Sequence, residues 1–452
     1  MTPFDRVSRG RVVRHRHYLL TVLFAASVFN TIDGVALSLV LQQIKVDLSL
    51  TDTQLGVLTG IAFALFYSFV GLGIARWADR GDRVAIISVT AAVWSVLVAA
   101  CGAATNFVQL FLLRVGVGIG EAGYFPASQS LIADYFDRTE RARATAFLVT
   151  AAGMTYLVGY GVAGWLNEMF GWRVMFMLLG LPGLAVAILA WFTLREPRFE
   201  SSLNCERPGR FLASRSLLKS NASTAGFDAP RLKDVAIMLW SNHTLRHLLL
   251  FWSAAMFVGV GLARWQPAFF IRSHGLNTGA LGTGLSIACG IGGTVGPLLG
   301  GAWASRYAAN NERLFLKVAV GIWCATTVVS ACIYLVPDIS LAFGLLGLYM
   351  VASTVVFGPF WAMVQTLVPE GMRATVAAIF MLCGNLIGTG LGPLAAGVLS
   401  DALQPRFGEE SLRYTLLLLS SGFVWAAWHL WQASRSATHD LASTQRECIP
   451  TP

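Results

Sequence analysis

The sequence predicts an all-α fold made of membrane-spanning helices. Hydrophobic residues make up 55% of the 452 residues and charged residues only 13%, which is far more apolar than a soluble domain. Apolar runs of about 20 residues, enough to cross a bilayer as a helix, recur from one end of the chain to the other. Because lipid offers no partner to an unpaired backbone amide or carbonyl, each run is expected to be helical. We therefore predict a polytopic membrane protein.

Twelve runs are the expected elements, and a polar segment divides them into two sets of six. The predicted spans lie at residues 18–41, 54–75, 84–104, 106–133, 142–166, 173–194, 244–271, 278–304, 314–336, 338–364, 372–399 and 412–433. The predicted organisation is a basic N-terminal segment at 1–17, a six-helix bundle at 18–194, a linker rich in Ser, Arg and Asn at 195–243, a second bundle at 244–433 and a tail at 434–452.

The net charge of +9 does not point to nucleic acid, because the basic residues gather in alternate loops. The first 17 residues hold five arginines, and the loops expected on the same side add Arg76, Arg80, Arg83, Arg138, Arg141, Arg143, Arg306, Arg313, Lys317 and Arg373. Basic loops stay on the cytoplasmic side of a membrane. Both termini are therefore expected in the cytoplasm, with the protein in the cell membrane, which is the inner membrane if the source is bacterial.

Several classes of protein are excluded by what the spans lack. The seven cysteines are scattered without the spacing of a metal site, so no metal or other cofactor is expected. The spans contain no nucleophile and base pair, and no Walker-type loop that would bind ATP. The sequence Gly118–Gly123 fits GxGxxG, but no strand precedes it, so its glycines are interpreted as helix-packing positions. We expect neither an enzyme nor an ATP-driven pump.

Short internal repeats relate the two sets of spans. Residues 75–80, ARWADR, match residues 301–306, GAWASR, at an offset of 226 residues. The triplet Arg-Ala-Thr at 143–145 recurs at 373–375, at an offset of 230. Offsets close to half of the chain predict two pseudo-symmetric six-helix bundles with a binding site at their interface near the membrane midplane.

The loop after the second span carries a recognisable signature. Residues 75–83, ARWADRGDR, resemble the loop motif of the major facilitator superfamily, with Ala75 and Asp82 in place of its two glycines. In that family the loop latches the two halves together on the cytoplasmic side. The resemblance implies a gating role for Asp79, Arg80 and Arg83. The alternative interpretation is a solvated turn.

The first half resembles one group within that superfamily, the Spinster transporters of lysolipids and sphingolipids and their bacterial relatives. The resemblance rests on Asn30-Thr31-Ile32-Asp33, on Arg114 followed by GVGIGEAGY, and on Trp172-Arg173. Gly34 departs from the group, which usually has a basic residue after the aspartate, and the proline of the fourth span stands at Pro126. The resemblance implies a secondary transporter that works by alternating access.

Four ionisable residues lie well inside predicted spans: Asp33, Arg114, Glu121 and Arg264. Such groups are costly in lipid and are read as functional. Two neighbouring carboxylates cannot both ionise cheaply in an apolar site, so one of Asp33 and Glu121 is expected to hold a proton, with Arg114 as their shared partner in a proton relay. Arg264 is expected to bind an anionic head group. The alternatives are a permanent ion-pair network that fixes packing, and an Arg264 that reaches the membrane interface.

The expected cargo is an amphipathic lipid with a charged head group, such as a lysophospholipid or a sphingosine-phosphate-like molecule, moved with protons by a monomer among membrane lipids. The alternatives are a proton-coupled transporter of small organic anions, a drug exporter and, less favoured, a sensor on a transporter fold. Besides Arg264, the predicted substrate-binding residues are Asn30, Tyr124, Trp265, Trp361, Gln365 and Asn385.

Overall fold

A computed structural model describes residues 3–197, 232–308 and 312–447, and within these ranges the regular structure is entirely helical. The first half contains α1 (Pro3–Asp47), α2 (Asp52–Thr59), α3 (Ile61–Arg80), α4 (Arg83–Cys101), α5 (Phe107–Glu121), α6 (Tyr124–Tyr135), α7 (Arg138–Val149) and α8 (Ala151–Thr193). The predicted all-α fold class is confirmed. Most of the predicted linker lies outside the described residues.

The second half begins with a short helix and repeats the pattern. It contains α11 (Leu232–Ser241), α12 (His243–His274), α13 (Thr278–Trp303), α14 (Glu312–Leu335), α15 (Ile339–Val355), α16 (Phe357–Leu367), α17 (Arg373–Cys383), a π-helical segment (Gly384–Leu391), α18 (Gly392–Phe407) and α19 (Ser411–Glu447). Helices α1 and α19 extend well beyond the predicted spans, through most of the expected N-terminal segment and tail.

Nine segments of the described chain are long and apolar enough to cross a membrane. Two of them contain a sharp turn at a glycine with positive φ. Helix α8 is 43 residues long and is interrupted at Gly171, and the segment from Thr375 to Ala437 includes the turn at Gly408. The predicted fourth span is formed by α5 and α6, which are separated at Ala122 and Gly123. The count of twelve crossings stays a prediction.

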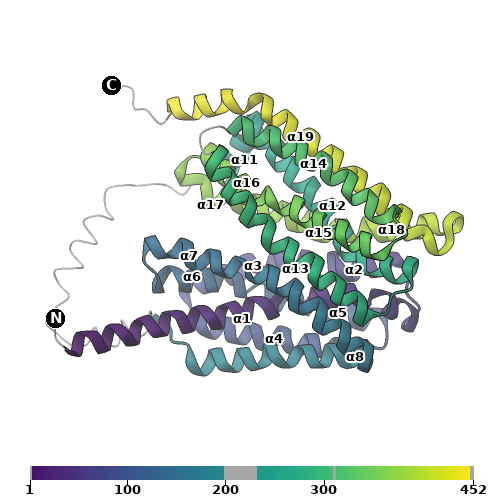
Figure 1. Ribbon diagram of the computed structural model, residues 1–452. Coiled ribbons are helices and arrows are strands. Elements are labelled where there is room, and N and C mark those ends of the chain that lie inside the picture. Colours follow the sequence, from purple (N-terminus) through teal and green to yellow (C-terminus); the bar gives the residue numbers. More distant parts are fainter. Residues whose placement is uncertain (1–2, 198–231, 309–311, 448–452) are drawn as a thin grey trace.

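The two halves lie side by side, with α1 to α8 in purple to teal and α11 to α19 in green to yellow (Figure 1). Helix α1 begins and α19 ends at the same end of the molecule. We call the opposite end, which carries the turns at Asp47–Asp52, Gly171, Gly275 and Gly408, the distal end. The halves pack together mainly through α8 against α13, α2 against α18 and α1 against α12. These contacts enclose the space in which the candidate site lies.

Candidate functional site

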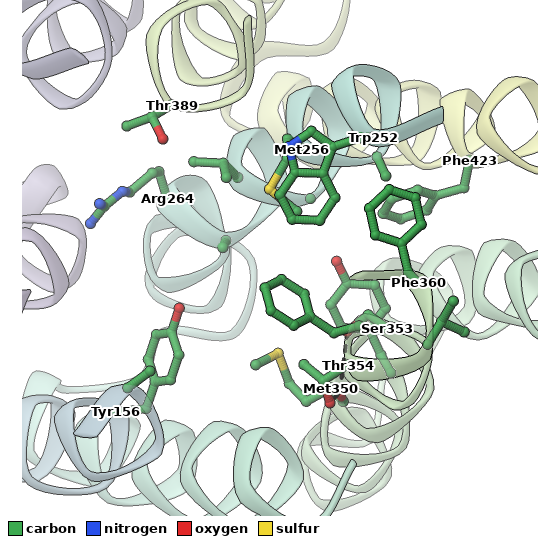
Figure 2. Close-up of a pocket in the computed structure, with 18 of the residues that line it drawn as sticks. Tyr156, Trp252, Met256, Arg264, Met350, Ser353, Thr354, Phe360, Thr389 and Phe423 are labelled. Atoms are coloured by element: carbon green, nitrogen blue, oxygen red, sulfur yellow. Dashed lines mark hydrogen bonds between the residues drawn. The ribbon is translucent and has the colours of Figure 1, made fainter. Parts of the chain in front are cut away.

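A cavity of about 420 Å³ lies between the halves. Helices α1 and α8 supply its first wall, including Thr31, Thr155 and Tyr156. The opposite wall is largely aromatic and comes from α12, α14, α16 and α19, with Phe251, Trp252, Trp323, Phe357, Phe360 and Phe423. Figure 2 shows Tyr156 and Arg264 on one side of the space and Trp252, Phe360 and Phe423 on the other. The cavity is therefore charged at Arg264 and mostly aromatic on the opposite side, where Ser353 and Thr354 add hydroxyl groups (Figure 2).

Arg264 is the charged residue among the described residues that line this cavity. Its guanidinium extends from α12 toward the first half, and Nη1 donates a hydrogen bond to the carbonyl oxygen of Gly34 in α1 (Figure 2). A Cβ atom at Gly34 would lie 2.9 Å from Nη1 of Arg264. The missing side chain at position 34 thus makes the space that the guanidinium occupies, and a cation from the second half contacts the backbone of α1 directly after Asp33.

The predicted charge cluster forms inside the first half. Arg114 of α5 makes an ion pair with Asp33 of α1 through Nη1 and Oδ2. Asp33, Arg114 and Glu121 are each at most 3% exposed. Glu121 interacts electrostatically with Asp33, Arg114 and Arg264, and its Oε1 has no hydrogen-bond partner among the described residues. The three residues predicted from the sequence are therefore neighbours, and Arg264 is within their electrostatic reach.

Two predicted substrate-binding residues are instead used in packing. The Tyr124 hydroxyl donates to the backbone carbonyl of Leu23, and its ring meets the edge of Trp94 with the centroids 6.3 Å apart. Trp265 is fully buried and donates from Nε1 to the carbonyl of Pro393 at 2.9 Å. Both side chains join helices of one half, and neither lines the cavity that the structure describes.

Four further predicted residues also lie away from this cavity. Asn30 is buried, Gln365 is exposed and Asn385 is half-buried. Trp361 packs behind the cavity wall, against the ring of Trp252, with the centroids 5.4 Å apart. Whether a residue lines the cavity depends on which face of its helix it occupies, and hydropathy does not reveal that face.

Of the predicted gating residues, Arg83 is described in full, whereas the side chains of Asp79 and Arg80 are not among those that the structure describes. Arg83 is completely buried at the start of α4. It makes ion pairs with Glu196 and, at 2.7 Å, with Asp134, and it donates to the carbonyl of Ser130 at 2.9 Å. These partners all belong to the first half, so Arg83 joins α4 to α6 and to the end of α8.

The cavity also contains residues that the sequence predictions missed, among them Trp252, Met256, Ser353, Thr354 and Thr389. A signal was present for some of them. Trp252, Met256, Val260 and Arg264 recur every four residues, a spacing that places side chains along one face of a helix. Starting from Arg264, this spacing identifies the cavity face of α12.

Two helical halves that face each other across a central cavity, with Arg264 at its wall and a buried charge cluster in the first half, are typical of a membrane transporter. The chain belongs to the Major Facilitator Superfamily, whose profile matches residues 23–393. This is a superfamily of transporters and not of enzymes.

Individual relatives agree with this assignment. The chain is 29% identical to an MFS-type efflux pump of Mycolicibacterium smegmatis, with 94% of each chain covered. It is 24% identical to a probable L-galactonate transporter of Escherichia coli, with 92% of this chain and 88% of the relative covered. The fold matches the crystal structure of a bacterial homologue of the human lysosomal transporter Spinster, in an inward-facing and unoccupied conformation. That match has a TM-score of 0.77 and 28% identity, and it covers 94% of this chain and 98% of the other. The resemblance to Spinster proteins is confirmed.

Proposed function

We propose that this protein moves an amphipathic molecule with an anionic head group, such as a lysophospholipid or a sphingosine-phosphate-like lipid, by alternating access linked to protons. The observation that carries this proposal is the polarity of the cavity. One guanidinium stands at one side of a space of about 420 Å³ whose opposite wall is aromatic. Cavities of this size accept drug-sized ligands.

The head group is assigned to Arg264. A guanidinium can donate two parallel hydrogen bonds to a phosphate or carboxylate, and such charge-assisted bonds are stronger than neutral ones. In the structure Nη1 is bonded to a neutral carbonyl, that of Gly34. An incoming anion offers Arg264 a better acceptor, so substrate binding draws the guanidinium from the first half into the cavity. The aromatic wall of the second half then takes the apolar part of the substrate.

The proton is assigned to the cluster of Asp33, Arg114 and Glu121. Arg114 is already paired with Asp33, and burying a second, unpaired carboxylate as an anion costs several kcal/mol. In our proposal Glu121 carries the proton while Asp33 holds Arg114. When Arg264 moves toward the substrate, Glu121 loses a neighbouring positive charge. Anion binding and proton retention therefore support each other, which is the basis of coupled movement.

The orientation follows the charge bias of the loops. We place both termini, with the basic loop that contains Asp79 and Arg80, in the cytoplasm, and the distal end on the opposite side of the cell membrane. In this arrangement the signature loop, including Arg83, contributes to gating on the cytoplasmic side. The chain works as a monomer, because its cavity is complete between its own two halves.

Uptake into proteoliposomes with an imposed pH gradient tests the proposal. We expect a lysophospholipid to be transported with the gradient, Arg264→Gln to abolish its binding, and Glu121→Gln to remove the dependence on the gradient. Arg246→Gln is the matched control, because Arg246 lies on the same helix and bonds to the carbonyl of Trp240, away from the cavity. Transport that is independent of pH and survives both Asp33→Asn and Glu121→Gln would contradict the proton relay.

A small organic anion is the second candidate. Hydroxyl groups of Thr31, Thr155 and Tyr156 in the first half, and of Ser353 across the cavity from Arg264, line the space (Figure 2), and such groups suit a hydroxylated acid. The similarity to a probable L-galactonate transporter supports this alternative, and the similarity to an efflux pump supports drug export. Sugar acids and cationic dyes in the same uptake assay decide among a lipid, an organic anion and a drug as the substrate. A lipid transporter is expected to take up neither the sugar acids nor the dyes.

A further inference from the structure

At the distal end, a carboxylate from each half caps a helix of the other half. Glu168, near the break in α8, accepts hydrogen bonds from the backbone amides of Thr278 at 3.1 Å and Gly279 at 3.4 Å. Asp401 of α18 accepts from the backbone amides of Asp52 at 3.0 Å and Thr53 at 2.7 Å. The hydroxyls of Thr278 and Thr53 donate to the same two carboxylates. The first two amides of α13 and of α2 thus find their acceptors across the interface.

Each capped helix also has a cap of its own, and the two kinds of cap do not compete. The side chain of Thr51 accepts from the amide of Gln54 at 3.2 Å, and that of Asn277 accepts from the amide of Ala280 at 3.0 Å. These are the third amides of α2 and α13, so the first two are left for a partner. The acid from the other half therefore completes the capping of each helix start.

The two caps are related by the internal repeat. Asp52 and Thr278, the first residues of the capped helices, are separated by 226 residues, which is the offset between the repeated segments 75–80 and 301–306. The carboxylates that cap them come from corresponding positions near the ends of the fifth and eleventh predicted spans. Each half thus gives one acid to the other and receives one in return, as a pseudo-twofold relation requires.

Glycines allow the helices to come this close. A Cβ atom at Gly282 of α13 would clash with the carbonyl of Tyr160 in α8, and one at Gly397 of α18 would clash with the carbonyl of Asp52. Gly56 of α2 meets Pro393 in the same way, with 2.7 Å between its added Cβ atom and the carbonyl oxygen. The carboxylates are therefore held at helix crossings where backbones touch.

We propose that Glu168 and Asp401 form a paired latch that keeps the distal end closed. A helix start carries partial positive charge and unpaired donors, and a carboxylate stabilises both. These bonds exist only while α8 meets α13 and α18 meets α2, so they favour the closed state over the open one. An interaction present in one of two states shifts their populations by its own free energy. The latch acts without substrate and is independent of what the cavity binds.

The two caps differ in strength. Glu168 is exposed, whereas Asp401 is half-buried and sits beside a second set of contacts between the halves. In that set Asp52 accepts from Arg272 through both oxygens at 2.7 Å and from Ser400 at 2.6 Å. Exposure weakens an electrostatic contact. Loss of the Asp401 cap is therefore expected to open the distal end more than loss of the Glu168 cap.

Spin labels measure the opening directly. In a chain whose own cysteines have been replaced, Val46→Cys and Leu335→Cys place labels at exposed distal positions of α1 and α14, one in each half. Double electron–electron resonance then reports the populations of short and long distances. Because 1.4 kcal/mol corresponds to a factor of ten, we expect Asp401→Ala to raise the ratio of long to short distances about tenfold. Glu168→Ala should raise it about threefold.

Further variants separate the latch from general damage. Thr278→Pro removes two hydrogen bonds to Glu168, those from the backbone amide and from the hydroxyl of Thr278. Proline fits at this first helical position. The variant should raise the ratio at least as much as Glu168→Ala, because it also removes the bond that Nδ2 of Asn167 in α8 donates to the Thr278 hydroxyl at 2.8 Å. Glu410→Ala is the control, because Glu410 lies at the distal end but pairs with Arg413 of its own half. The milder Asp401→Asn serves if Asp401→Ala does not fold. An unchanged distance distribution in folded Asp401 variants, or an equal shift from Glu410→Ala, overturns the proposal.

Discussion

Gly34 and Arg264 show how the absence of a side chain positions a charge. The guanidinium lies against the α-carbon of Gly34, one residue after Asp33, so a cation reaches the first half although α1 does not supply one there. A basic residue at position 34 would be fixed in α1. Arg264 belongs to α12 and separates from α1 whenever the halves move apart, which makes its contact with Gly34 dependent on conformation.

Gly34→Ala tests this contact. The added methyl group would lie 2.9 Å from Nη1, so the guanidinium must leave its present position. We expect the KM for an anionic substrate to change by roughly tenfold, the scale of one charged hydrogen bond, with little change in kcat. Gly321→Ala is the matched control, because an added Cβ at Gly321 of α14 meets nothing within 4 Å. An equal effect of both variants on KM would exclude a specific role for position 34.

Asp33 and Arg114 are buried together, and each compensates the charge of the other. Removing one partner of a buried pair typically costs about 3–5 kcal/mol, because a charge remains without compensation. We expect Asp33→Asn and Arg114→Met each to lower the apparent Tm in detergent strongly, and the double variant to recover much of the loss. Additive losses in the double variant would show that the two side chains do not interact.

Residues of this cluster could be predicted from the sequence because ionisable groups inside apolar runs are rare and costly. Asp33, Arg114 and Glu121 were identified on that ground and are neighbours in the structure. Residues such as Trp252 and Thr354 could not be identified in the same way. Aromatic and hydroxyl side chains are common on lipid-facing and buried faces alike, and only the packing of the two halves decides which of them line the cavity.

At the scale of elements, α8 shows that hydropathy predicts membrane crossings but not the position of the turns between them. Predicted spans at 142–166 and 173–194 are joined in one helix of 43 residues, interrupted by Gly171 at φ 79°. The apolar content predicts that the chain crosses twice, and one glycine with positive φ and extended ψ provides the sharp turn between the crossings. The separation of the fourth span into α5 and α6 has its own signal in Pro126, because proline has no N–H to donate to the carbonyl of Ala122 and so interrupts a continuous helix there.

Gly171→Ala is expected to destabilise the protein by about 1–3 kcal/mol, the cost of placing a side chain at positive φ and extended ψ, a region that is essentially restricted to glycine. An added Cβ atom at Gly171 meets nothing within 4 Å, so the effect is purely conformational. The apparent Tm of Gly171→Ala, measured beside that of Gly171→Asn, checks this. Asn should recover none of the loss, because ψ 164° at Gly171 lies outside the αL region that Asn tolerates. Equal stability of Gly171→Ala and the unmodified chain would contradict the expectation.

At the scale of the whole molecule, the described hydrogen bonds that join the halves lie from the midpoint to the distal end. They include Arg264 to Gly34, Trp165 to Thr283 at 3.2 Å and the bonds around Asp52. The internal repeats at 75–80 and 301–306 predicted two equivalent halves. The repeats could not predict which end of the molecule is closed. The conformation that is open at the distal end and the one that is closed there are built from the same helices.

Access to the cavity checks this asymmetry. A single cysteine introduced as Ser353→Cys, in a chain free of its own cysteines, should react with a membrane-impermeant maleimide added from the side of the termini. It should react at least about tenfold more slowly with reagent added from the distal side, since an excess of 1.4 kcal/mol in favour of closure gives that ratio. Equal rates from both sides would show that the distal contacts do not close the cavity.

The caps at the distal end also constrain how this protein can change over generations. Their donors are backbone amides, which every residue except proline supplies at Asp52, Thr53, Thr278 and Gly279. Mutational drift in the receiving helices thus leaves the amide donors in place, and the strength of the two caps depends mainly on the two acids. A descendant chain could acquire a different resting conformation, and with it a different affinity and speed, by one substitution at Glu168 or Asp401, far from the cavity that recognises its cargo.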